Sequence, residues 1–180
     1  MPLDILNSQV DSIRSEAASA LDSHSRQIKA IETDVSLSAE GKTERKRAVN
    51  ESAKESMRRL RQKENDAINM KVRDLERVLD SKVGNTASDI IAFRDAQDRA
   101  ERFENADDAV KALERAIRTD DTVLAHAIFR RGIDSNWRSV LASFGNSYPD
   151  KKDLVGELAY LREAQTNTFG RGMHYMWMNQ

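Results

Sequence analysis

Residues 42–83 decide the fold of this chain, and they read KTERKRAVNESAKESMRRLRQKENDAINMKVRDLERVLDSKV. The stretch contains no proline or glycine, and apolar or small side chains recur along it in steps of three and four. This spacing places them on one face of a helix, with charged residues around the rest of the circumference. At 1.5 Å per residue the helix is roughly 60 Å long, so it needs a packing partner along its length. The stripe consists of Val49, Ala53, Met57, Leu60, Ile68, Val72, Leu75, Leu79 and Val83, with the carboxylate Glu64 in its middle.

A second apolar stripe precedes this helix, in residues 3–35. The segment SLSAEGK, residues 36–42, interrupts the pattern and offers Ser36 or Ser38 as a helix N-cap. An antiparallel hairpin of two helices is the natural interpretation, and association with another subunit is the alternative. The steps of the long stripe average about 3.8 residues, wider than the 3.5 of a heptad, so a regular leucine zipper is not expected. The members of the first stripe are Leu6, Val10, Ile13, Ala17, Ala20, His24, Ile28, Ile31 and Val35.

All ten aromatic residues lie after residue 92, which divides the chain. Aromatic side chains supply the large buried areas that close a compact core. We therefore predict an all-α protein in three parts. Residues 1–86 form an extended, coiled-coil-like arm of two helices with a turn near 36–42, residues 87–165 form a small bundle of short helices, and residues 166–180 form an irregular tail rich in aromatic residues and methionine.

The composition is that of a helical, solvent-rich protein, with 33% charged and 39% hydrophobic residues and a net charge of −1. The absence of cysteine excludes disulfides, thiolate metal sites and cysteine catalysis. No stretch approaches twenty apolar residues, and the N-terminus lacks a basic region followed by a long apolar run. Neither a transmembrane span nor a secretory signal is therefore expected.

Catalytic and cofactor motifs are missing from the sequence. The histidines His24, His126 and His174 are far apart, and none lies in a metal-ligand spacing such as HExxH. His24 is interpreted as a half-exposed residue of the helix seam. There is no phosphate-binding loop, no dinucleotide fingerprint and no nucleophile elbow. We therefore predict no enzyme activity, catalytic residue, metal, cofactor or small-molecule substrate.

A local excess of positive charge marks the first half of the long helix. Residues 42–63 carry nine basic side chains against three acidic ones. This excess suits phosphates or an acidic protein partner, and a merely solvated helix face is the remaining alternative. Residues 89–121 carry ten acidic and six basic side chains, so the chain also complements itself or its copies. The basic face predicted to bind a partner comprises Arg45, Lys46, Arg47, Lys54, Arg58, Arg59, Arg61 and Lys63.

The tail concentrates large adaptable side chains between two glycines and the chain end. It is interpreted either as a strap folded back over the bundle or as a docking tail for a protein partner. The residues assigned to this second role are Phe169, Met173, Tyr175, Met176, Trp177 and Met178.

The chain resembles small helical proteins encoded among the head-assembly genes of tailed bacteriophages of actinobacteria. The resemblance covers about two-thirds of the chain. It is carried by the LSAEGK turn at residues 37–42, by the D-x-x-L-A-x-A-I element from Asp121 to Ile128, and by the helix start at Trp137. The proline-rich tail of that family has no counterpart in residues 166–180.

The resemblance implies a non-enzymatic virion structural protein, either a minor capsid or a head-associated protein, located in the capsid and assembled in the host cytoplasm. The implied partners are the major capsid protein and further copies of the chain, with the arm and the tail as contacts. A scaffolding protein that acts only in the procapsid is one alternative. A nucleic-acid-binding module that uses residues 42–63 is another, less favoured because no aromatic residues interleave with the basic ones.

Overall fold

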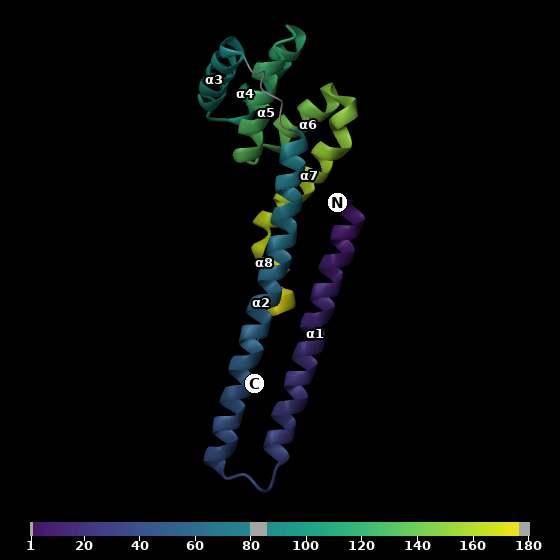
Figure 1. Ribbon diagram of the computed structural model, residues 1–180, viewed down its shortest axis with the longest axis vertical. Helices are drawn as coiled ribbons and strands as arrows, with labels where there is room; N and C mark the ends of the chain where they lie inside the picture. Colours follow the sequence, from purple (N-terminus) through teal and green to yellow (C-terminus); the bar gives the residue numbers. More distant parts are fainter. Residues whose placement is uncertain (1, 80–85, 177–180) are drawn as a thin grey trace. The chain divides into compact units, whose positions relative to one another are not determined.

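The computed structural model describes residues 2–79 and 86–176, and the regular structure of these residues is helical throughout (Figure 1). The predicted all-α class is therefore confirmed. The elements, in chain order, are α1 Leu3–Thr33, α2 Ala39–Leu79, α3 Ala87–Glu101, α4 Ala106–Arg118, α5 Thr122–Asp134, α6 Arg138–Ser147, η1 Pro149–Lys151, α7 Lys152–Thr166, α8 Thr168–Gly172 and η2 Met173–Tyr175.

The helices form two compact units whose limits differ from the predicted boundaries. Unit 1 contains the described residues of Met1–Lys71 and Ala164–Gln180, and unit 2 is Val72–Glu163. The last turns of α2 thus belong with the bundle, and the tail belongs with the arm. Where an irregular tail was predicted, α8 and η2 are helical. The predicted end of the long helix at Val83 lies outside the described residues.

Unit 1 is built on an antiparallel hairpin of α1 and α2, which run side by side in opposite directions (Figure 1). Side-chain bonds link the two helices at regular intervals, and one joins His24 Nε2 to Asn50 Oδ1 at 2.8 Å. Nearer the turn, Lys46 Nζ lies 2.6 Å from Glu32 Oε1. The turn itself is shorter than predicted, since α2 begins at Ala39. Ser38 caps this helix, as its hydroxyl accepts a hydrogen bond from the Gly41 N–H at 3.1 Å.

Burial along the hairpin is uneven. The stripe of α1 is buried from Leu6 to Ala17, whereas Val35 at the turn is 99% exposed. On α2 the stripe residues from Met57 to Leu79 are buried, and Val49 and Ala53 are only partly buried. The half of the hairpin near the turn therefore has little core of its own, because two helices alone cannot cover both stripes.

Unit 2 is a bundle of short helices closed by aromatic side chains. Phe129 of α5 stacks on Phe144 of α6 with ring centroids 4.1 Å apart, and both rings are buried. Helices α4 and α5 each begin with a polar N-cap residue. Asn105 Oδ1 accepts a hydrogen bond from the Asp108 N–H at 2.9 Å, and Asp121 Oδ1 accepts one from the Leu124 N–H at 3.0 Å. Helix α5 crosses α6 closely at Gly132, where an added Cβ would lie 2.7 Å from Val140 Cγ1.

Two glycine-to-alanine substitutions in helices of unit 2 test this packing. We expect Gly132→Ala to lower the free energy of unfolding by about 1–3 kcal/mol, because the new methyl group meets the Val140 side chain. Its matched control is Gly156→Ala in α7, where an added Cβ meets nothing within 4 Å. That variant should gain up to about 1 kcal/mol from helix propensity. Urea unfolding followed by circular dichroism measures both, and equal stability of the two variants would contradict the close crossing.

Candidate functional site

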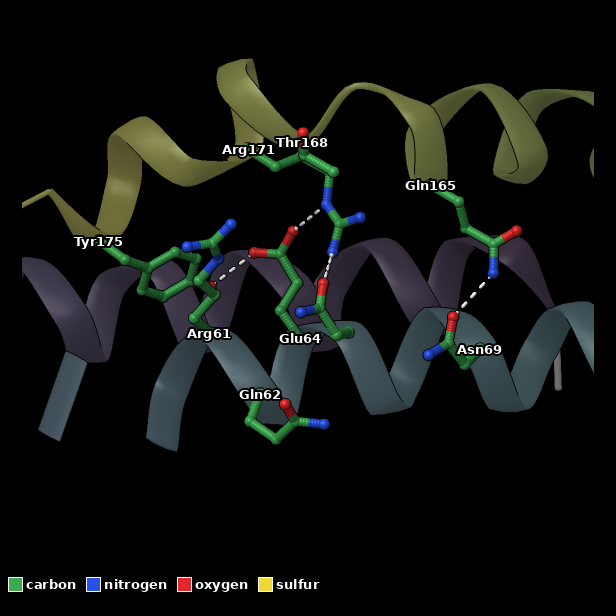
Figure 2. Close-up of a pocket in the computed structure, with 9 residues that line it drawn as sticks. Arg61, Gln62, Glu64, Asn69, Gln165, Thr168, Arg171 and Tyr175 are labelled. Atoms are coloured by element: carbon green, nitrogen blue, oxygen red, sulfur yellow. Dashed lines mark hydrogen bonds and ion pairs between the residues drawn. The ribbon is translucent and has the colours of Figure 1, made fainter. Parts of the chain in front are cut away.

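A buried carboxylate, Glu64, lies within the apolar stripe of α2 and is bonded by groups from three other segments of unit 1. Figure 2 shows two of these groups, from Arg171 and Tyr175. The Oε1 atom of Glu64 accepts hydrogen bonds from Arg14 Nη2 of α1 at 3.0 Å and from Arg171 Nε of α8 at 2.8 Å. Its Oε2 atom accepts from Arg14 Nε at 3.1 Å and from the hydroxyl of Tyr175 in η2 at 2.5 Å. We call these four residues the Glu64 cluster.

The local sequence explains how each member reaches the cluster. Glu64 lies one helical turn from both Leu60 and Ile68, so the stripe carries it inward. Arg14 follows the buried Ile13 on α1 and faces Glu64 because the two helices are antiparallel. Arg171 lies in α8, a short helix capped by Asn167, whose Oδ1 accepts from the Gly170 N–H at 3.1 Å.

The electrostatics of the cluster keep Glu64 ionised. Burial raises the pKa of its carboxyl, but the hydrogen bonds from Arg14, Tyr175 and Arg171 outweigh burial and lower the pKa from 4.5 to about 2. Burial and the hydrogen bond to this carboxylate raise the pKa of Tyr175. Since both oxygens already accept two hydrogen bonds each, the carboxylate is suited to holding segments together and not to proton transfer near neutral pH.

Further contacts fix residues 167–176, which we call the strap, along the arm. Arg171 Nη2 donates to Asn65 Oδ1 at 2.5 Å, and its Nη1 donates to the carbonyl oxygen of Ala164 at 3.1 Å. Just before the strap, Gln165 Nε2 donates to Asn69 Oδ1 at 2.7 Å. The Tyr175 ring packs in the arm's own apolar cluster of Ile13, Ala17, Met57 and Leu60.

A polar pocket of about 300 Å³ lies between the strap and α2 (Figure 2). One side is formed by the cluster residues Glu64, Arg171 and Tyr175, and the other by the exposed guanidinium of Arg61. The remaining lining residues are Gln62, Asn65, Asn69, Gln165 and Thr168.

The structure spreads the predicted basic face around α2. Lys46, Lys54, Arg58 and Lys63 each pair with a nearby glutamate, and these ion pairs are largely exposed. Such pairs contribute little to stability and separate easily when a partner arrives. Four residues of the basic face follow one another at steps of seven, four and three residues, so they form one row along α2. We call it the basic row, and its last residue lines the pocket. The basic row consists of Arg47, Lys54, Arg58 and Arg61, and Arg45, Lys46, Arg59 and Lys63 point elsewhere.

The predicted tail residues divide into two sets. Tyr175 is buried against the arm, where its hydroxyl donates a hydrogen bond to Glu64, so its side chain does not belong to the exposed part of the tail. The interpretation as a strap agrees with these contacts, although the contacts that hold the strap are with α1 and α2 and not with the bundle. Phe169, Met173 and Met176 are exposed. Trp177 and Met178 lie outside the described residues.

The apolar spacing places Glu64 on the stripe, but it gave no indication of the cluster. A lone carboxylate on such a stripe is itself a signal, because a buried charge needs partners. The identity of those partners was not readable, since Arg171 and Tyr175 lie 107 and 111 residues further along the chain. The half-buried seam position predicted for His24 is confirmed.

Comparison with known proteins adds no relative: no protein-family model, curated protein or solved structure matches this chain. Among residues 2–79 and 86–176, no group of three or more histidine or acidic side chains is arranged to hold a metal ion. None of the helices described here is both long and apolar enough to cross a membrane. The features of the chain that bear on function are the Glu64 cluster, the strap and the basic row.

The Glu64 cluster predicts a specific dependence of stability on pH. A carboxyl whose pKa is lowered by folding stabilises the protein above its unfolded pKa near 4.5, and this contribution is lost as the pH falls toward about 2. Glu64→Gln removes the negative charge that balances Arg14 and Arg171 and replaces one of the two acceptor oxygens with an NH2 donor. We expect it to lower the free energy of unfolding at pH 7 by about 3–5 kcal/mol.

The measurement is urea unfolding of the wild type and the variant at several pH values between 7 and 2. The difference in the free energy of unfolding between the two proteins should decrease below about pH 4.5, because only the wild type loses the contribution of the Glu64 carboxylate. Glu55→Gln is the matched control on the same helix, since Glu55 forms an exposed pair with Arg58 and should contribute less than about 1 kcal/mol. A constant gap across this pH range would contradict the structure.

Proposed function

We propose that this chain is a non-enzymatic structural protein of a tailed-phage head, a minor capsid or head-associated protein that binds coat subunits through the arm and the strap. One observation carries the proposal. The strap is held to the arm by polar side chains on its inner face, and its exposed outer face bears Phe169, Met173 and Met176. A fixed apolar surface on a long helical arm is suited to binding another protein.

The construction of unit 1 supports a role in holding position. Helix α2 has 41 residues, and the hairpin buries its stripe most completely around the Glu64 cluster. Buried ionic groups with complete hydrogen bonding favour one packing arrangement over its neighbours. The strap is therefore expected to present the same surface in every copy, which an assembly of repeated subunits requires.

Two of the three elements that carry the resemblance to head-assembly proteins have structural roles compatible with the same setting. The LSAEGK segment forms the connection between α1 and α2, with Ser38 as the cap. The Asp121 element begins α5, where Asp121 is the cap and Leu124 and Ile128 are buried. On this proposal the partners are the major capsid protein and further copies of the chain, and the location is the capsid.

Quantitative mass spectrometry of purified particles tests the proposal. We expect the protein in mature virions of the phage that encodes it, at a constant ratio to the major capsid protein from one preparation to the next. Procapsids purified in parallel are the control, because a scaffolding protein would be present in them and absent from mature particles. Absence from both kinds of particle would refute a structural role in the head.

A second candidate function, nucleic-acid binding, is favoured by the basic row, whose four side chains follow one side of α2. Phosphate groups bound by such a row release counterions, so the affinity falls steeply with salt. We expect charge reversal of Lys54, Arg58 and Arg61 to abolish any gel shift of DNA or RNA seen at about 50 mM salt. Charge reversal of Arg94 and Arg99 on α3 and of Arg102 at its C-cap is the control of equal charge change. The absence of a shift for the wild type at this salt concentration would remove this candidate.

A further inference from the structure

The strap exposes the face that a short helix normally buries. Phe169, Met173 and Met176 recur at steps of four and three residues, and their side chains are 78%, 60% and 54% exposed. On the opposite side, Arg171 and Tyr175 are directed at Glu64 (Figure 2). Because the Glu64 cluster holds the polar side inward, the apolar side faces outward. A contiguous exposed apolar face of this kind marks a protein contact, and methionine adapts well to a partner surface.

The pocket beside the strap has hydrogen-bond donors to spare. Both oxygens of Glu64 are saturated by the cluster, and the amide oxygens of Asn65 and Asn69 accept from Arg171 and Gln165. This use of the oxygens leaves the two amide nitrogens as donors, next to the guanidinium of Arg61. The chemistry that satisfies this surface is a carboxylate, since it offers acceptors and a negative charge. The basic row extends the same preference along α2.

The outer face of α3 has the complementary chemistry. Ile91, Asp95 and Asp98 recur at steps of four and three residues, and Ile91 is 68% exposed. They lie on the side of the helix opposite to the buried Ala96 and Ala100. Residues 89–121, which include this face, carry four more acidic than basic side chains. One exposed helix face thus combines an apolar side chain with carboxylates at the spacing of a single stripe.

We propose that the strap and the adjoining pocket of one copy bind the outer face of α3 of a second copy. The apolar strap residues contact Ile91, and the pocket and the end of the basic row receive the carboxylates of Asp95 and Asp98. This inference rests on the proposed function and deepens it, since it names a second copy as a partner. Because the two surfaces differ, the contact is head-to-tail, and every open oligomer has a free strap at one end and a free α3 at the other.

Sedimentation velocity of the full chain tests the proposal by complementation. The wild type should associate as its concentration rises, and added salt should weaken this association. Two variants each remove one surface: a strap variant, Phe169→Ser with Met173→Ser, and an α3 variant, Ile91→Ser with Asp98→Lys. Each variant alone should associate at least about tenfold more weakly than the wild type. Mixed in equal amounts, the two variants should form dimers and nothing larger, because each supplies the surface that the other lacks.

Met70→Ser is the matched control, because Met70 is 64% exposed on α2 and lies outside the proposed contact. It should associate as the wild type does, and circular dichroism should show the same helix content for all variants. A wild type that stays monomeric would overturn this inference, and so would variants that fail to complement each other. If the α3 variant still associates as the wild type does, the contact is a symmetric one between two straps, and the proposed contact between strap and α3 is wrong. None of these results bears on whether the protein is present in virions, so the two proposals fail separately.

Discussion

The structure of unit 1 depends on one constraint, the requirement that a buried carboxylate be fully compensated. Glu64 has no exposed area, and an ion in that position is unstable unless charged and hydrogen-bonding groups surround it. Arg14 supplies two of the four hydrogen bonds from α1, and Arg171 and Tyr175 supply the other two from the strap. The carboxylate therefore determines where α1 and the strap pack on α2. An aliphatic residue in place of Glu64 would allow α1 to shift along α2. It would also remove the acceptor that holds the Arg171 side chain on the inner side of the strap.

The orientation of the strap follows from the same constraint. A five-residue helix is too short to be stable alone, so the side that it buries is decided by its strongest contacts. Here those contacts are ionic, and the consequence is an apolar outer face next to a pocket of spare donors. The proposed roles of the strap in binding coat subunits and further copies thus depend on hydrogen bonds that form within one chain. Changes at Glu64 would alter the surface indirectly, by releasing the segment that presents it.

Much of the fold was predictable because the apolar period is unusually regular. The stripe from Met57 to Leu79 and the break at residues 36–42 are local signals, and they led to the hairpin and the all-α class. The boundary near residue 72 was not predictable, since the stripe continues unchanged while its packing partner changes from unit 1 to unit 2. The position of the strap was equally hidden, because pairing across more than 100 residues leaves no trace in local spacing. Of the candidate site, only the anomaly of Glu64 was visible beforehand.

The distribution of charge is as informative as the distribution of apolar residues. The chain carries almost no net charge, yet the basic excess lies in residues 42–63 and the acidic excess in residues 89–121. Evenly mixed charges would give the same net value without creating complementary surfaces. Segregation of this kind favours ordered contacts between different regions of neighbouring copies, and near-neutrality lets many copies gather without mutual repulsion. The proposed role in a capsid requires both properties. The proposed pairing of the apolar strap face with the acidic, isoleucine-bearing face of α3 would supply them through two short stripes of side chains.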